Sequence, residues 1–321
     1  MTTGHAGQLT DVIDTALASA VRAPSPHNTQ PWRFEVRAGR IDVLLDRSRI
    51  LRAADPEGRE ARLACGAALF NLRVALQAAG QATAVDLRPI GKPDQLATVW
   101  LTGACVPTTE DHMLAAAVDQ RHTNRRVFTE RPVSDEIRGA LARAAALEGA
   151  RLLVVDDPAR LDAVVALLAE AEDRQRRDAE FCVELSYWAT SFAGRDEGVP
   201  VALGGPRPRA DGLADAGPFK LDAVALRPLP LVGVLVSPSD ISQDVVRAGQ
   251  ALQRVLLTGT SSGVSASFLS PLVEVAWARR ALRAQATRIG QPQAVLRFGY
   301  GQETAPTPRR PVRAVCRYTG A

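Results

Sequence analysis

"RAPSPHNTQPWRFEV", residues 22–36, joins a helix-like segment to an abruptly apolar, strand-like run. Pro24 and Pro26 stiffen the backbone of this stretch, while Ser25 and Asn28 supply side-chain hydrogen bonds and favour turns. A stiff loop of this kind can present amides and a hydroxyl to a planar ligand at a small cost in ordering. The stretch therefore predicts a rigid ligand-binding loop that leads directly into a core strand.

The end of this stretch, Gln30-Pro31-Trp32, predicts an anchor that fixes the loop to the core through a buried Trp32. The alternative is a rigid connection between a helix and a strand with no ligand. It explains Pro31 and Trp32 well, but it leaves the polar residues before them unexplained. We expect His27 on the loop surface, not as an acid or base, because no neighbour in the sequence orients it.

Length and charge set the broad class. A chain of 321 residues with 46% hydrophobic residues can bury one large core or two, which favours a globular protein of two domains or two fused halves. The net charge is +4, but the basic residues are interspersed with acidic ones. This pattern predicts mild attraction for small anions and no nucleic-acid partner.

Cysteine spacing and hydropathy restrict the compartment. The four cysteines lie far apart, which supports neither a zinc site nor a disulfide framework and favours a reducing compartment. The first 20 residues lack the basic and apolar regions of a signal peptide. No run reaches the ~18 apolar residues of a membrane span. We therefore expect a cytoplasmic protein without a metal site or a membrane anchor.

Two segments of the chain are weakly self-similar. "CGAALFNLRVALQAAG" (65–80) and "AGQALQRVLLTGTSSG" (248–263) align without gaps and match Gly66 with Gly249. Both predict buried helices that end at a glycine. Each segment follows a β-rich run and precedes another: 41–46 and 96–101 in one half, 231–236 and 294–300 in the other. The pattern predicts two tandem pseudo-repeats, residues 1–107 and 108–321, in an α/β (α+β) fold.

The two halves are complementary. The second half has the bare connection "LEGA" (147–150) where the first half has its elaborate loop. Conversely, near its start the second half has a segment, residues 113–137, in which a predicted helix leads into the arginine-dense "RHTNRR" (121–126), and the first half has no counterpart. Taken alone, this arginine segment also fits a solvated helix end or a nonspecific nucleic-acid patch.

Three motifs together carry a resemblance: "APSPHNTQPWRF" (23–34), "RHTNR" (121–125) and the run from "GYG" to "RRP" (299–311). In these motifs and in its length the chain resembles the FMN-dependent nitroreductase family, and within it the Acg-like branch of dormancy-associated proteins. The resemblance implies a nitroreductase-like fold in which mixed or antiparallel central sheets are wrapped by helices. It further implies that a dimer has been fused into one polypeptide, with one FMN per chain between its halves.

The resemblance also implies the site. Arg121 would bind the FMN phosphate, Thr123 a ribityl or phosphate oxygen, and Arg125 the N1/O2 edge of the ring. Arg309 or Arg310 would give a second phosphate contact, with Arg309 in the better aligned position. The full cofactor-binding set is Pro24, Ser25, Pro26, Asn28, Gln30, Arg121, Thr123, Arg125, Gly263, Arg309 and Arg310.

Two members of this set need comment. The family often has a lysine two residues before the phosphate-binding arginine, but this chain has Thr307 there. Gly263, in "TSSGVSA" (260–266), would let the backbone approach the N5 edge of the flavin. The end of a helix explains Gly263 almost as well.

The second half also carries an insertion, residues 158–230. It predicts helical structure from about Pro158 to Ser191 and a Gly/Pro-rich stretch over 193–230, which is either a lid or a surface excursion. Two functions follow. The first is ping-pong hydride transfer through FMN from a transient NAD(P)H to nitroaromatics or quinones, without a catalytic side chain. The second is flavin sequestration under a closed lid. In either case the chain would be a monomer by its internal pseudo-dimer, or a weak homodimer.

Overall fold

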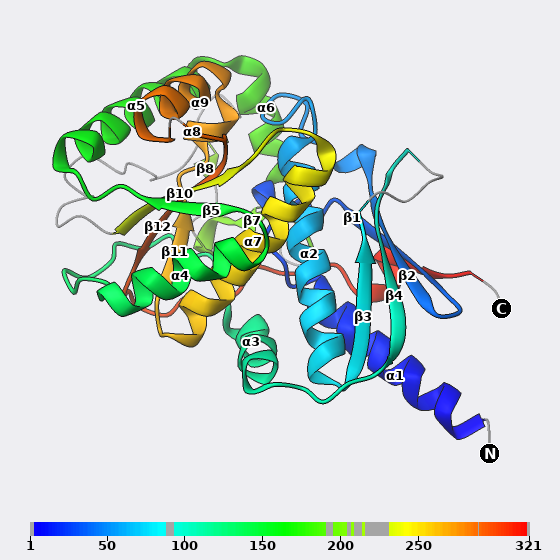
Figure 1. The fold of residues 1–321 in the computed structure, drawn as a ribbon. Coiled ribbons are helices and arrows are strands. Elements are labelled where there is room, and N and C mark those ends of the chain that lie inside the picture. Colours follow the sequence, from blue (N-terminus) through cyan, green and yellow to red (C-terminus); the bar gives the residue numbers. More distant parts are fainter. Residues whose placement is uncertain are drawn as a thin grey trace.

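Two sheets, with two long helices between them, form the framework of the computed structural model (Figure 1). The model describes residues 3–87, 93–190, 195–203, 207–208, 214–215, 231–287 and 289–319. The first sheet has the strand order β13-β1-β2-β4-β3. Its pairs are antiparallel except for β1 with β13, which is parallel. Its strands are β1 (Trp32–Arg37), β2 (Arg40–Leu45), β3 (Gln81–Asp86), β4 (Gln95–Ala104) and β13 (Cys316–Tyr318).

The second sheet is antiparallel and has the order β11-β12-β10-β5. Its strands are β5 (Arg151–Val154), β10 (Leu231–Ser237), β11 (Ser265–Phe268) and β12 (Gln291–Gly299). Strand β10 is buried along its whole length because helices cover both faces of this sheet. There are also two short two-stranded sheets among the described residues. In one, β6 (Ala189–Thr190) pairs with β7 (Val199–Pro200), and in the other, β8 (Arg207–Pro208) pairs with β9 (Ala214–Asp215).

Helices α2 (Arg59–Ala78) and α7 (Ser242–Ser261) lie between the sheets and pack closely on each other (Figure 1). A Cβ added to Gly66 would lie 2.2 Å from the carbonyl oxygen of Val246, and one added to Gly249 would lie 2.1 Å from that of Leu63. The contact is reciprocal, as in a two-fold interface. Val246 lies three residues before Gly249, and Leu63 lies three residues before Gly66. Leu63 belongs to the core of the second sheet and Val246 to that of the first, so each helix contributes to both cores.

The two sheets share one strand order. Four strands of the first sheet, β1-β2-β4-β3, correspond in chain order and in pairing to β5-β10-β12-β11. Helix α1 (Thr3–Ala20) packs on α2, and α4 (Asp135–Leu147) packs on α7. A tandem repeat predicts this correspondence. Strand β13 is the exception, because it comes from the range assigned to the second half and extends the first sheet.

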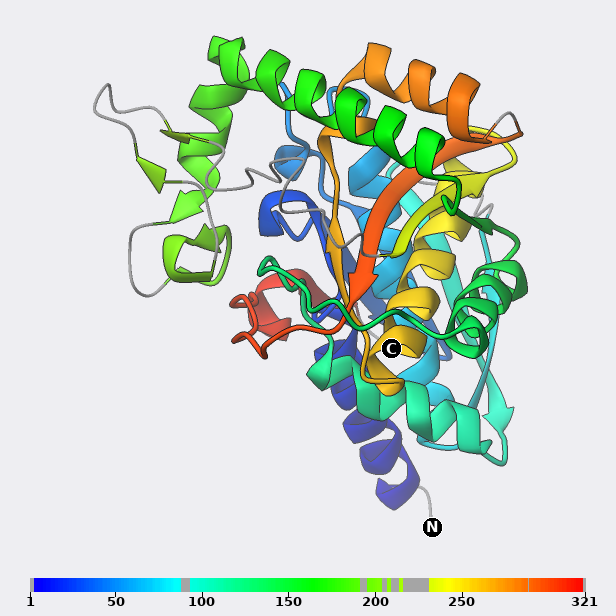
Figure 2. The ribbon, with the colours of Figure 1, turned by 90° about the vertical axis from the view of Figure 1, so that its left-hand side faces the viewer.

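The remaining helices cover the outside. Helices α5 (Pro158–Arg177), α8 (Pro271–Glu274) and α9 (Ala276–Leu282) pack on the outer face of the second sheet (Figure 2). Helix α6 (Ala179–Trp188) follows α5 after a break at Asp178, and α3 (Thr109–Gln120) lies against α2 and α7. Short turns of helix are η1 (Pro26–Asn28), η2 (Arg47–Arg49), η3 (Val201–Leu203), η4 (Arg283–Thr287) and α10 (Val312–Val315).

The predicted mixed α/β fold, with central sheets wrapped by helices, is confirmed. The helical structure predicted from about Pro158 to Ser191 is present over 158–188 as α5 and α6, but Ala189 and Thr190 form strand β6 instead. Most of the Gly/Pro-rich stretch 193–230 lies outside the described residues, so its part of the predicted lid stays a prediction.

Candidate functional site

The loop between α1 and β1 has an unusual backbone. His27, Asn28 and Gln30 adopt positive φ angles of 44°, 57° and 53°. Such angles are uncommon outside glycine and persist only where the surroundings hold them. One such contact is local, because the hydroxyl of Ser25 accepts a hydrogen bond from the backbone N–H of Gln30 at 3.0 Å. We call residues 24–30 the Pro-Ser loop.

Trp32 and His27 test two expectations for this loop. Trp32 is 0% exposed and belongs to the first core, so its predicted anchoring role is confirmed. The expectation that His27 lies on the loop surface is wrong. His27 faces a cavity and lies edge-on to Phe181, with the ring centroids 6.3 Å apart. Burial, together with the positive charge of Arg125, lowers the pKa of His27 to about 4, so the ring is neutral near pH 7.

The cavity is lined by residues from both predicted halves of the chain. The Pro-Ser loop and the first turns of α2 line it from residues 1–107, and α7, β11 and β12 line it from residues 108–321. Helices α5 and α6 of the insertion form a further wall. Members of the predicted set on the wall are Pro24, Ser25, Pro26, Asn28, Thr123, Arg125 and Arg309.

The buried Arg121 and the partly buried Arg125 and Arg309 form a cationic cluster beside the cavity. Burial lowers the pKa of Arg121 and Arg125 to about 10, and for Arg121 the charge of Arg125 adds to this effect. Burial and the charges of Arg121, Arg22 and Arg125 lower the pKa of Arg309 to about 9. In the described part of the chain, no carboxylate forms an ion pair with any of these three side chains. The cluster is therefore repulsive unless an anion binds there.

The hydrogen bonds of the cluster lead to the same conclusion. Arg121 is 6% exposed and donates to the carbonyl of Arg22 at 3.1 Å, and Arg309 donates to the carbonyl of Ala23 at 3.1 Å. The Nε atoms of both arginines are buried without a hydrogen-bond partner. Buried charged donors of this kind are rarely left unpaired. The donor set fits a phosphate, which accepts several charge-assisted hydrogen bonds.

The segment that carries two of these arginines is fixed by its neighbours. Thr123 forms a bridge with Ala266 of β11, and the backbone N–H of Asn124 donates to the carbonyl of Ala266 at 2.9 Å. The fully buried Asn124 also donates from its side chain to the carbonyl of Gln302 at 3.0 Å. No local pattern in the sequence indicates a role for Asn124, because its partner lies almost 180 residues further along the chain.

Four members of the predicted set lie outside the cavity wall. Arg121 lies behind it, in the cationic cluster, and Gln30 is fully buried and bonded to backbone. The side chain of Arg310 turns to the carbonyl of Ala314 at 3.0 Å. Gly263 has a φ of 72° and closes α7. Its N–H donates to the carbonyl of Thr260, and the next N–H, of Val264, to that of Gly259, a helix-ending motif that explains the glycine.

A group of carboxyls, which the sequence did not predict, lines another part of the cavity. Burial raises the pKa of Glu274 to about 7, and that of Glu60 well above its usual range. Glu274 accepts a hydrogen bond from Gln175 of α5 at 2.6 Å. In the sequence both glutamates appear as ordinary first-turn residues of helices.

Helix α6 is held firmly against the first half. Its apolar face contributes Phe181, Leu185 and Trp188 to a core shared with Leu51 and Ala54. Glu184 accepts hydrogen bonds from the backbone N–H groups of residues 52–54. The wall that α6 provides is thus built into the fold.

The chain is similar to proteins of Mycobacterium tuberculosis. It is 35% identical over 317 residues to "Putative NAD(P)H nitroreductase Rv3131", an alignment that covers 95% of this chain and 91% of that protein. It is 32% identical over 318 residues to "Putative NAD(P)H nitroreductase acg", with 95% of each chain covered. The chain therefore belongs to the Acg-like nitroreductase family.

Comparison of structures gives weaker likenesses. The FMN-dependent nitroreductase NfnB from Mycobacterium smegmatis, solved with NADPH, matches with a TM-score of 0.46 and 18% identity, over 65% of this chain and 99% of NfnB. A nitroreductase with bound FMN from Desulfitobacterium hafniense matches with a TM-score of 0.39 and 16% identity, over 65% and 98% of the two chains. No protein-family model matches the chain.

Two further findings concern the described residues alone. None of their helices is long and apolar enough to cross a membrane. No group of three or more His, Cys, Asp or Glu side chains among them is arranged to hold a metal ion.

Proposed function

We propose that the chain is an FMN-binding oxidoreductase of the nitroreductase type. The observation that carries the proposal is the cationic cluster of Arg121, Arg125 and Arg309, which lacks a carboxylate partner among the described residues and borders the cavity beside the Pro-Ser loop. FMN offers the dianionic phosphate that such a cluster needs and the flat ring that a rigid loop can hold. The names of the relatives support the same class.

When bound, FMN would supply two-electron transfer between NAD(P)H and an acceptor such as a nitroaromatic or a quinone, in alternate half-reactions. Arg121 and Arg309 would neutralise the phosphate. Arg125 would face the N1/O2 edge, where it stabilises negative charge. The neutral His27 and the apolar side chains of α5 and α6 would exclude water from the ring.

The test is anaerobic addition of NADPH and then NADH to the purified, flavin-loaded protein, with the flavin absorbance followed over time. We expect the flavin absorbance to bleach promptly and to return when a nitroaromatic or a quinone is added. A protein that cannot be loaded with FMN would refute the proposal. We expect one FMN per chain, since the described residues hold one such cationic cluster and the sequence has one Pro-Ser loop. We also expect a monomer or a weak homodimer, since the cluster and the loop come from the same chain.

A matched pair of variants tests the cluster. Arg309→Ala removes a partly buried phosphate donor, and we expect FMN to bind about 10- to 100-fold more weakly, the range for a hydrogen bond to a charged group. Arg310→Ala is the control, because its guanidinium turns away from the cavity to the carbonyl of Ala314. Equal losses in both variants would count against a phosphate site at Arg309.

One observation favours a second candidate, flavin sequestration without turnover. The wall formed by α6 is fixed by Glu184 and by the apolar core around Phe181, which limits access to the ring from that side. On this reading NADPH and NADH leave the loaded protein yellow, and only a small reductant such as dithionite bleaches it.

A further inference from the structure

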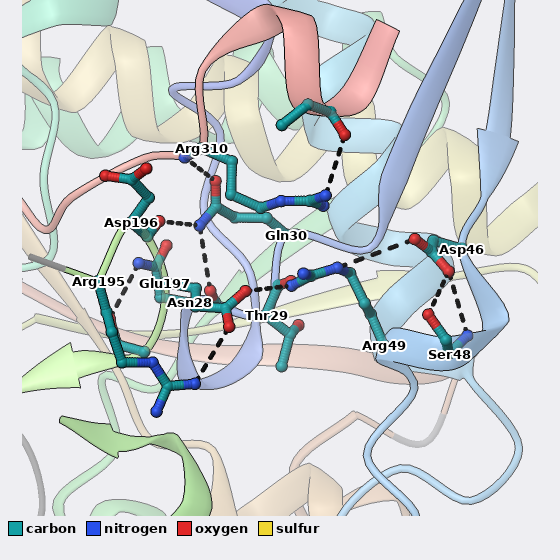
Figure 3. A network of polar contacts seen from close by, with 12 residues as sticks. Asn28, Thr29, Gln30, Asp46, Ser48, Arg49, Arg195, Asp196, Glu197 and Arg310 are labelled. Carbon is teal, nitrogen blue, oxygen red and sulfur yellow. Dashed lines mark hydrogen bonds and ion pairs between the residues drawn. The ribbon is translucent and has the colours of Figure 1, made fainter.

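Three distant segments meet beside the cavity: the Pro-Ser loop, residues 195–198 of the insertion, and residues 308–310 near the C-terminus (Figure 3). The side-chain amides of Asn28 and Gln30 join all three. We call these two carboxamides, with the backbone groups that they bridge, the carboxamide clasp. Both residues are almost fully buried, with 4% and 0% of their surface exposed.

Each carboxamide spans the same two segments. The Nδ2 group of Asn28 donates to the carbonyls of Gly198 and Pro308, at 2.9 Å each. The Nε2 group of Gln30 donates to the carbonyl of Asp196 at 2.7 Å, and its Oε1 accepts from the backbone N–H of Arg310 at 2.8 Å. Asn28 and Gln30, two residues apart in the loop, thus each bind one residue of 195–198 and one residue of 308–310. These contacts fix the positions of the three segments relative to one another.

An ion pair completes the clasp between the two carboxamides. Nη1 of Arg49 donates to the carbonyl of Thr29 at 2.8 Å and binds Oε2 of Glu197 at 2.7 Å, while Arg195 binds the other carboxylate oxygen at 3.1 Å. Burial alone would raise the pKa of Glu197, but the hydrogen bonds and charges of Arg49 and Arg195 outweigh burial and lower it. The side chains of Arg49 and Glu197 are only 17% and 20% exposed, so solvent screens this pair weakly.

The clasp holds Arg309 on both sides. It fixes the carbonyl of Pro308 before Arg309 and the N–H of Arg310 after it, so the backbone that carries the guanidinium cannot shift without breaking buried hydrogen bonds. It also fixes Gly198, which precedes the cavity-lining Val199. Gln30 does not reach the cavity, so its position in the loop is explained by these backbone contacts.

We propose that Gln30 and Glu197 are positioning residues that hold the guanidinium of Arg309 at the phosphate of the bound flavin. The inference rests on the proposed function. It assigns Gln30 a structural task in place of ligand contact, and it gives residues 195–198 of the insertion a role in phosphate affinity. Loss of either side chain then weakens phosphate binding specifically.

The experiment compares FMN with riboflavin, which has the same ring but no phosphate. Glu197→Gln keeps the size of the side chain and removes its charge; we expect FMN to bind about tenfold more weakly and riboflavin to change by less than about twofold. Gln30→Leu should show the same selectivity with a larger loss. Glu110→Gln is the control and should change neither affinity, since Glu110 of α3 pairs with Arg254 of α7 and neither residue lines the cavity.

A double-mutant cycle separates positioning from general damage. In an Arg309→Ala background, Glu197→Gln should no longer change the affinity for FMN, because the group that it positions is gone. Two results would overturn the inference. One is that Glu197→Gln weakens the binding of FMN and of riboflavin equally. The other is that Glu197→Gln weakens FMN binding as much in the Arg309→Ala background as in the wild type. Wild-type protein that binds neither flavin would refute the proposed function instead. The same variants would then be compared through the rise in Tm caused by inorganic phosphate, and an unaltered rise in Glu197→Gln would overturn the positioning role.

Discussion

Substitution of Gly249 by alanine tests the packing of α2 on α7, on which the site depends. The new Cβ would lie 2.1 Å from the carbonyl oxygen of Leu63 and 2.8 Å from Cα of Gly66. Both are backbone atoms, so no side-chain rotation can relieve the clash. Ordinary contact begins near 3.4 Å, so the helices must separate by 3.4 − 2.1 = 1.3 Å along that line.

The cost follows from this separation. A gap of about 1 Å forfeits a large part of the dispersion energy along the contact, and overpacking of a tight core costs about 1–3 kcal/mol or more. The higher helix propensity of alanine offsets about 1 kcal/mol. Because the obstruction is backbone on both sides, we expect an overpacking cost at or above the top of this range, about 3–4 kcal/mol. After the offset, the free energy of unfolding should fall by about 2–3 kcal/mol. Gly66→Ala should behave alike, since the contact is reciprocal.

Urea unfolding at fixed temperature measures the change through the midpoint at constant slope. Gly259→Ala is the matched control in the same helix. There the nearest atoms to an added Cβ are at 3.4 and 3.6 Å, so its stability should be unchanged or up to about 1 kcal/mol higher. Leu63 and Leu252 of these helices line the cavity, so Gly249→Ala should also weaken FMN binding. A Gly249→Ala protein as stable as the wild type would refute the packing argument.

Three further predictions concern the flavin-free protein. Thr108→Ala removes one side of the capping box with Asp111 at the start of α3, and should lower the free energy of unfolding by about 1 kcal/mol in urea. Because the pKa of His27 falls from 6.5 to about 4 on folding, the wild type should lose stability as the pH drops through that window, and His27→Gln should lose less when Tm is followed with pH. Burial, with the charge of Asp55, raises the pKa of Glu274 from 4.5 to about 7, so the wild type should lose stability as the pH rises from 4.5 to 7. Glu274→Gln should remove this loss and raise Tm relative to the wild type at pH 8; an unchanged pH dependence in either variant would contradict the assignment.

Much of the fold could be predicted from local patterns in the sequence. The spacing of apolar residues located α2 and α7, and the ungapped alignment that pairs Gly66 with Gly249 matches two residues that meet in space. The predicted helix over 158–191 is interrupted at Asp178, whose side chain accepts hydrogen bonds from the N–H groups of Glu180 and Phe181. An aspartate at that position is a signal for a new helix start that the periodicity alone does not reveal.

The site was less predictable where it depends on long-range partners. The Pro-Ser loop was identified as unusual, yet its three positive φ angles are held by backbone groups up to 280 residues away. Gln30 therefore looked like a ligand contact. His27 looked exposed, because Phe181 and Arg125, which surround it, come from distant segments. The buried acids Glu60 and Glu274 carry no local signal for the same reason.

The predicted repeat raises the question of why a second flavin is not expected at the corresponding place in residues 108–321. Where the first half has the Pro-Ser loop, the second half has the short connection that contains Glu148, and this carboxylate pairs with Arg73 at 2.9 Å and with Arg254 at 3.1 Å. Helix α3 covers the adjacent surface, with Leu114 and Val118 packed against Phe70 and Leu257. A flavin at this place would have to displace an apolar cluster and would meet arginines that already have carboxylate partners. The cationic cluster at Arg309 has no such partner among the described residues, so on the proposed function the phosphate of FMN would be favoured there over the surroundings of Glu148.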